Sequence, residues 1–172
     1  MEKRGKKAQL EISFGMIFSI ILIIAFLAVA IYAIILFLNV KKCSDVGTFK
    51  DDLQGEIDRA YSSDESSYVF NGSLASGIKL CFIDLSKESK GANEEVYTGF
   101  KKYGYVKVNM FYWPLQLKCP TTFNLNHLNI TEITKSNNPY CISNIKGKIS
   151  LKIEKSFYDA LVCINCEGSS NN

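Results

Sequence analysis

The stretch ISFGMIFSIILIIAFLAVAIYAIILFL, residues 12–38, decides the fold of this chain. It holds 27 residues without a charge, Asn, Gln or Pro. A helix of that length reaches about 40 Å, and crossing ~30 Å of hydrocarbon takes about 20 apolar residues. A secretory signal has only roughly 7–15 apolar residues before its cleavage site. We therefore predict a transmembrane helix over residues 12–38, rather than a removed signal or a buried core helix.

The charges beside the span predict its orientation. The basic residues that precede it are Lys3, Arg4, Lys6 and Lys7. Only Lys41 and Lys42 follow it closely. Basic residues favour the cytoplasmic side of a span. We therefore expect a single-pass membrane protein with a cytoplasmic tail over residues 1–11 and an extracytoplasmic C-terminal part.

The remaining charge is nearly balanced. The chain has 172 residues and a net charge of +3. Residues 1–44 carry six Lys or Arg against two Glu, whereas residues 45–172 carry 14 against 15 Asp or Glu. Because nucleic-acid binding requires a basic face on the folded domain, the sequence argues against a nucleic-acid partner. The length that follows the span suits one domain with its own core.

An amphipathic helix is predicted directly after the span, over residues 39–62. Its apolar residues recur at three- and four-residue spacing, and they are Val46, Phe49, Leu53, Ile57 and Tyr61. This spacing places one apolar stripe along a helix. No Pro separates the two parts, so we expect one helix to continue from the span, with Gly47 as the place for a bend.

The period then changes to the alternation of β-strands, over residues 63–166. Strand patterns occupy residues 66–72, 76–86, 104–113 and 121–133, and residues 144–166 resemble a hairpin. Residues 93–103 suit a helix or a turn-rich link. The last six residues, 167–172, are Glu, Gly, Ser and Asn and are predicted to be disordered. The predicted class is α+β, with a long transmembrane helix, an amphipathic continuation and a mainly antiparallel β-sheet head.

Six cysteines, all beyond the span, predict disulfides. They are Cys43, Cys81, Cys119, Cys141, Cys163 and Cys166. Six cysteines allow 15 pairings. We favour Cys81 with Cys141, because both lie in strand-like runs among hydrophobic residues. Some of the six remaining free and buried is the alternative.

Cys163 and Cys166 form a CxxC motif, for which a structural disulfide is favoured over redox catalysis. A redox motif places a thiol at a helix N-terminus, which lowers its pKa, and the residues after Cys166 do not favour a helix. His127 is the only histidine and is expected to be solvated. No metal, cofactor or small-molecule substrate is therefore predicted, and the chain is not expected to be an enzyme.

Other side chains fit an external domain. Asn71 and Asn129 each begin an N-x-Ser/Thr glycosylation signal. The aromatic residues 111–113 are expected in the core or against the membrane.

Glu11 lies at the start of the apolar run, where a helix N-terminus favours an anion. If the chain were cut before Gln9, Glu11 would instead lie close to a new amino group and could pair with one from a neighbouring subunit.

The N-terminal residues KKAQLEISF resemble the class III signal of archaeal type IV pilin-like proteins. The resemblance makes Lys7 and Ala8 the recognition pair and Gln9 the first mature residue. Glu11 would be the third mature residue, whereas many pilins have Glu at the fifth. The runs IKLCFIDLS and NIKGKISLKIEK also look like small single-span membrane proteins of unknown function from archaea with reduced genomes.

This resemblance implies a structural role. We expect a membrane-anchored, pilin-like protein that is a subunit or minor component of a surface filament or envelope assembly. Its partners would be the membrane and other pilin-like subunits or copies of itself, through the N-terminal helix. The alternative is a permanently anchored protein whose external domain is an adhesin, a binding module or a subunit of a membrane complex.

Overall fold

A computed structural model describes residues 14–115 and 119–166 of the chain. Its first helix, α1, runs from Phe14 to Tyr61 and continues through Gly47. The chain divides into two compact units between Val40 and Lys41. The apolar part of α1 belongs to the first unit, and the amphipathic part belongs to the second, which we call the folded unit. The predicted tails, residues 1–11 and 167–172, lie outside the described residues.

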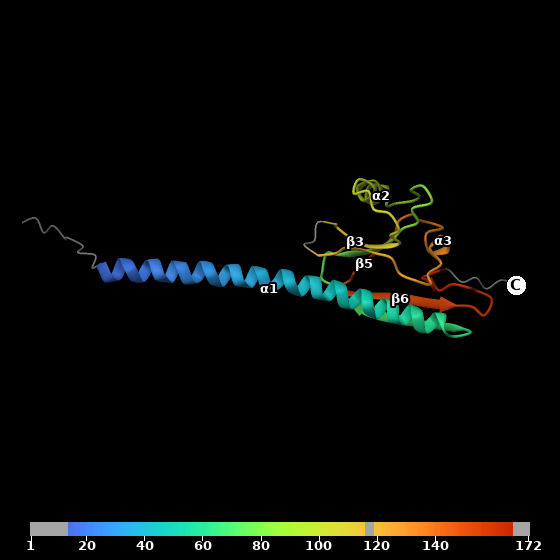
Figure 1. The fold of residues 1–172 in the computed structure, drawn as a ribbon, viewed down its shortest axis with the longest axis horizontal. Helices are drawn as coiled ribbons and strands as arrows, with labels where there is room; N and C mark the ends of the chain where they lie inside the picture. Colours follow the sequence, from blue (N-terminus) through green and yellow to red (C-terminus); the bar gives the residue numbers. More distant parts are fainter. Residues whose placement is uncertain (1–13, 116–118, 167–172) are drawn as a thin grey trace, which may run out of the picture. The chain divides into compact units, whose positions relative to one another are not determined.

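The folded unit contains two antiparallel sheets and two further helices (Figure 1). The three-stranded sheet has the order β1 (Ser66–Ser73), β6 (Lys148–Lys155), β7 (Cys163–Ile164). The four-stranded sheet has the order β4 (Thr122–Phe123), β3 (Met110–Trp113), β2 (Lys79–Phe82), β5 (Tyr140–Ser143). The helices are α2 (Glu94–Lys101) and α3 (Ile130–Ile133). This arrangement confirms the predicted α+β class.

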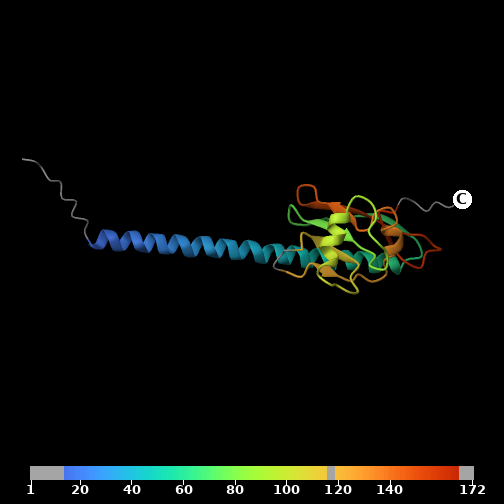
Figure 2. The same ribbon diagram turned by 90° about the horizontal axis from the view of Figure 1, so that it is seen from above.

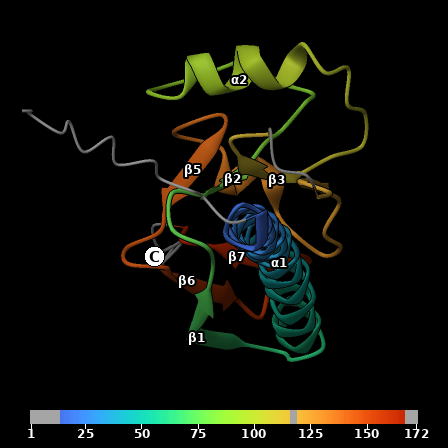
Figure 3. The ribbon, with the colours of Figure 1, turned by 90° about the vertical axis from the view of Figure 1, so that its left-hand side faces the viewer.

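The amphipathic part of α1 is the centre of the main core (Figure 3). Its buried residues are Val46, Phe49, Leu53, Ile57 and Ala60. The Phe49 ring meets Phe70 of β1 edge-on at 5.6 Å and Tyr112 of β3 at 6.2 Å, between centroids. The helix therefore contacts both sheets. Tyr61, predicted in the stripe, is 40% exposed, because the three-residue step from Ile57 brings Ala60 to the core instead.

The four-stranded sheet is buried on both faces. Leu80 and Phe82 join the main core, whereas Cys81 and Ile83 join a second cluster with Val96, Tyr97 and Phe100 of α2. α2 lies on the side of this sheet away from α1 (Figure 1, Figure 3) and is nearest the viewer in Figure 2. Residues 93–103 thus supply a helix, α2, which covers the second face of the four-stranded sheet.

Three strand predictions were too long. The run 76–86 forms a strand only over Lys79–Phe82. The run 104–113 forms a strand only from Met110, although Phe111 and Tyr112 are in the core as expected and Trp113 is half-buried. The run 121–133 forms two strand residues and then α3. The Asn129 side-chain oxygen accepts a hydrogen bond from the Glu132 N–H at 3.2 Å, and this cap starts a helix. Local alternation could not reveal it.

The predicted hairpin over residues 144–166 is confirmed in outline. β6 buries Ile149, Leu151 and Ile153 and exposes the residues between them. β7 pairs with it antiparallel, with Ile164 opposite Ile153. β7 is two residues long, because the preceding Val162 pairs with residues 127–129.

Candidate functional site

The N-terminal residues singled out by the sequence, namely Lys7, Ala8, Gln9 and Glu11, lie outside the described residues. Their predicted roles in processing and assembly therefore stay predictions. The described part of the same region begins at Phe14, and its apolar helix is the first candidate site.

The apolar part of α1 is exposed along its whole length. Phe26 is 71% exposed and Phe37 is 70% exposed. Among the described residues, α1 is the one helix that is long and apolar enough to cross a membrane. The Ser19 hydroxyl donates to the Gly15 carbonyl oxygen at 2.8 Å, so this polar group is satisfied within the helix. The surface is consistent with a single-pass membrane protein.

The cysteines form the second candidate feature, and the structure pairs Cys81 with Cys141 as the sequence predicted. The two residues are directly opposite on β2 and β5, with Cα atoms 4.1 Å apart. Cys81 is fully buried under α2. The bond joins residues 60 positions apart in the chain, so it restricts the unfolded state strongly.

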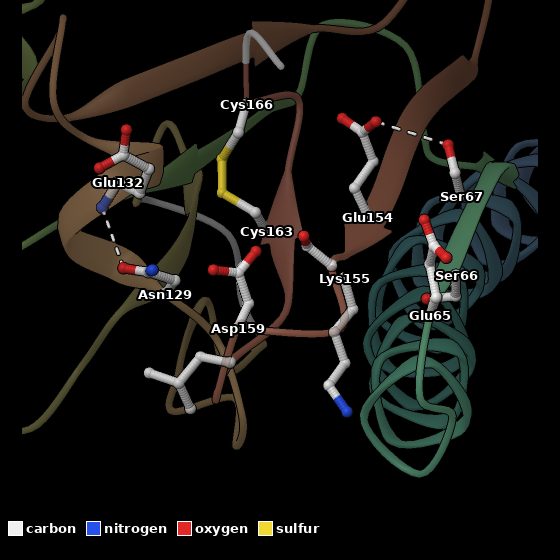
Figure 4. A pocket seen from close by; sticks show the side chains of 12 residues that line it. Glu65, Ser66, Ser67, Asn129, Glu132, Glu154, Lys155, Asp159, Cys163 and Cys166 are labelled. Atoms are coloured by element: carbon white, nitrogen blue, oxygen red, sulfur yellow. Dashed lines mark hydrogen bonds between the residues drawn. A yellow bond between two sulfur atoms is a disulfide. The ribbon is translucent and has the colours of Figure 1, made fainter. Parts of the chain in front are cut away.

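Cys163 and Cys166 are also joined, with Cα atoms 5.9 Å apart. Cys163 lies in β7 and not at a helix N-terminus, the position that activates a redox thiol. The disulfide lines a cavity of about 350 Å³. Figure 4 shows the disulfide with Glu132 and Asn129 on one side and Glu154 on the other.

The cavity beside this disulfide is acidic. It is lined by four acidic residues, Glu65, Glu132, Glu154 and Asp159, and by one basic residue, Lys155. Lys155 Nζ is engaged by the backbone oxygens of Tyr61 at 2.8 Å and Ser63 at 2.6 Å. Within residues 14–115 and 119–166, no group of three or more His, Cys, Asp or Glu is placed to hold a metal ion.

Cys43 and Cys119, the two remaining disulfide candidates, form a third pair, which the sequence did not single out among the possible pairings. Both are half-buried thiols in the structure, and Cys43 is a neighbour that shifts the pKa of Cys119. Burial, together with the hydrogen bond and charge of Cys43, raises the pKa of Cys119 to about 11. Cys43 lies in α1, where the chain enters the folded unit, so this contact joins that turn of the helix to the segment before β4.

Asp84, which sequence reasoning did not single out, organises a buried polar cluster. Burial raises its pKa, but hydrogen bonds from Ser86 and the charge of Lys87 outweigh burial and hold the pKa below its ordinary value. The Ser86 hydroxyl donates to Asp84 Oδ1 at 2.5 Å. Asn138 accepts from the Asp84 N–H at 3.0 Å and donates to the Asp84 carbonyl at 2.9 Å. The cluster fixes the link between β2 and α2 to the segment before β5.

The predicted glycosylation residues lie in different settings. Asn71 is exposed on β1, and its side-chain oxygen accepts from the Ser150 hydroxyl at 2.6 Å. Asn129 is half-buried and caps α3.

His127, expected to be solvated, is instead partly covered, because its ring stacks on Tyr61 at 3.7 Å between centroids. Its Nε2 lies 4.0 Å from an Asp58 carboxylate oxygen.

The chain was also compared with protein-family models, curated proteins and solved structures, and no match was found.

Proposed function

We propose that this chain is a pilin-like, membrane-anchored structural protein, a subunit or minor component of a surface filament or envelope assembly. The observation that carries the proposal is α1 itself. One helix presents an exposed apolar surface over residues 14–40 and then packs residues 46–60 between two sheets. A chain of this kind can enter an assembly by its helix while its folded unit remains in water.

The composition of the apolar helix supports lateral packing. Lipid removes the usual hydrophobic drive between helices, so close packing of small residues becomes important. The small residues within the apolar part are Ala25, Ala28, Ala30 and Ala33. The N-terminal resemblance adds cleavage between Ala8 and Gln9, after which Glu11 would meet the new amino group of a neighbouring subunit.

The proposed orientation has the N-terminus in the cytoplasm and the folded unit outside. The excess of basic residues before the span supports it. The two disulfides fit an oxidising compartment. The same location would expose Asn71 and Asn129 to glycosylation, which an intact mass equal to that of the bare chain would exclude.

N-terminal sequencing of the native protein, together with two variants, tests the proposal. We expect the mature chain to begin at Gln9 and to occur in long polymers sheared from cells. Glu11→Gln should leave cleavage and membrane insertion intact and reduce polymer. Glu2→Gln is the matched control, because the same chemical change lies in the part that cleavage removes. A native N-terminus at Met1, with particles of one discrete size, would support the permanently anchored binding protein instead.

A further inference from the structure

The three-stranded sheet ends in an open edge, formed by β1. Among residues 14–115 and 119–166, β1 pairs only with β6 (Figure 3). The Leu74 N–H donates to the Gly147 carbonyl at 2.9 Å, and the Asn165 N–H on the other side of β6 donates to the Lys152 carbonyl at 2.9 Å. Together these bonds set the phase of the ladder, because bonded pairs alternate along an antiparallel pair of strands.

The phase of the ladder determines which backbone groups of β1 are free. Ser66, Tyr68, Phe70 and Gly72 exchange hydrogen bonds with β6. The N–H and C=O groups of the alternate residues therefore point to the open edge, and these residues are Ser67, Val69, Asn71 and Ser73. Within the described part of the chain, no turn, loop or side chain forms a hydrogen bond with these backbone groups.

This edge lacks the features that usually protect an edge strand. Proteins shorten such strands or place Lys, Pro or bulges in them. β1 is eight residues long and contains no charge and no Pro. The other edge strands are shorter, with two residues in β4, four in β5 and two in β7. Val69, at the middle of β1, is 57% exposed.

An acidic groove of about 600 Å³, which we call the α1–β1 groove, runs beside the open edge, between α1 and residues 68–71 of β1. On the α1 side it is lined by the carboxylates of Asp51, Asp52 and Glu56 and by the guanidinium group of Arg59. Arg59 pairs with Glu56 and lies over the Tyr68 ring at 5.1 Å. Lys50 Nζ lies 2.9 Å from an Asp51 carboxylate oxygen, so among the described residues Asp52 is the groove carboxylate without an ion pair. The lining keeps a net negative charge and borders the place where a further strand would lie.

We propose that the open edge of β1 accepts an extended segment of a partner protein as an added strand, with Lys or Arg at alternate positions. Added strands gain affinity from main-chain hydrogen bonds and specificity from alternate side chains. Here every second side chain would face the α1–β1 groove and meet its carboxylates. The β1 of a second copy is a poorer occupant, because it carries no cation to offer them.

An eight-residue peptide that alternates Lys and Thr, matched to the length of β1, tests this proposal. The full chain is placed in nanodiscs of zwitterionic phosphatidylcholine, and amide hydrogen exchange of residues 66–74 is followed by mass spectrometry at low ionic strength. We expect the peptide to slow exchange at the edge amides. A peptide that alternates Glu and Thr should not, because its charges repel the groove.

Two controls separate strand addition from simple charge attraction. A Lys/Thr peptide that is N-methylated at alternate amides keeps its charges but cannot complete the ladder, so it should lose at least about tenfold in affinity. Val69→Pro removes an edge-facing N–H without removing a bond to β6, and it should have the same effect. Val69→Thr is the matched variant that should bind normally.

The groove is tested by Asp51→Asn with Asp52→Asn, which should weaken the Lys/Thr peptide by about fivefold or more. Equal binding of the methylated peptide, or no protection by the unmodified peptide, would overturn the proposal. Edge protection that rises with protein concentration in the absence of peptide would assign the edge to a second copy and overturn it as well. None of these outcomes depends on filament formation, so failure here is distinct from failure of the pilin-like role.

Discussion

At the scale of single residues, Cys43 and Cys119 are neighbouring free thiols that can form a further disulfide. Both thiols belong to the folded unit and lie within reach of each other. In an oxidising compartment such a pair is expected to form a disulfide, with its two electrons passing to a disulfide-bearing oxidant.

We therefore expect native protein to contain a third disulfide, between Cys43 and Cys119. Peptide mapping by mass spectrometry without reductant should find the two linked peptides. Alkylation of both thiols without prior reduction would contradict the expectation. In reduced protein the raised pKa of Cys119 predicts slow alkylation at neutral pH, with a rate that rises until the pH passes about 11.

Asp84 predicts a specific dependence of stability on pH. Its pKa is lowered in the folded state, so its contribution is present above the ordinary carboxyl pKa of about 3.9 and is lost as the pH falls toward the folded value. Asp84→Asn should lower the free energy of unfolding by about 1 kcal/mol at neutral pH. The difference from the wild type should shrink in acid, as measured by urea unfolding at several pH values.

Ser86→Ala offers a control for that experiment, because it removes a hydroxyl donor to the carboxylate and leaves the charge. It should raise the folded-state pKa of Asp84 toward its ordinary value, so the acid-induced loss of stability should be smaller and should be complete at a higher pH. A difference between Asp84→Asn and wild type that stays constant down to the lowest pH would show that the charge of Asp84 does not matter.

At the scale of elements, the packing of α1 against β1 depends on a missing side chain. A Cβ atom at Gly72 would collide with the Phe49 ring, whereas one at Gly55 would meet nothing within 4 Å. Gly72→Ala should therefore destabilise the folded unit by about 1–3 kcal/mol through overpacking.

Gly55→Ala is the matched change on the partner element, and it should stabilise α1 by about 1 kcal/mol. Thermal unfolding of the two variants measures both effects. Equal shifts in the same direction would show that β1 does not lie against Phe49 as described.

The two disulfides close loops of very different length, and their removal should differ accordingly. Replacing both Cys81 and Cys141 by Ala should cost about 4 kcal/mol by loop entropy, and replacing both Cys163 and Cys166 by Ala should cost about 2 kcal/mol. Chemical unfolding of the two double variants tests the order. A larger loss from the Cys163 and Cys166 pair would mean that this short bridge holds more structure than its loop suggests.

The sequence could predict elements whose period is local. The spacing of Val46, Phe49, Leu53 and Ile57 predicted the core face of α1, and the alternation of residues 148–154 predicted β6. It could not predict α3, because an Asn cap and pairing with Val162 override the alternation of that segment. The pairing involves Val162, which is distant in the chain, and the cap is a side-chain hydrogen bond from the Glu132 N–H to Asn129. Periodicity records neither of them.

The candidate sites divide in the same way. The link between Cys81 and Cys141 could be favoured, because each lies in a strand-like run of hydrophobic residues. Cys43 and Cys119 have no such pattern, and their contact depends on how α1 enters the folded unit. The α1–β1 groove depends on the spacing between a helix and an edge strand, which no local pattern specifies.

At the scale of the whole molecule, the charge difference across the span predicts a topology that epitope tags can test. A tag after Asn172 should be reached by antibody on intact cells. A tag after Met1 should be reached only after permeabilisation, and it should disappear from the mature chain if cleavage occurs at Gln9. Access to the Met1 tag on intact cells would reverse the orientation.

α1 has an exposed apolar part and a part that packs in the core of the folded unit, and this continuity has a mechanical consequence. Tension applied along the axis of this helix would reach the contacts of Val46, Phe49, Leu53 and Ile57 with the two sheets. These contacts are distributed along the helix axis, so the load would act on them in shear and together, rather than peeling them apart one by one. The same packing that folds the unit would then also bear any load that reaches this part of the helix.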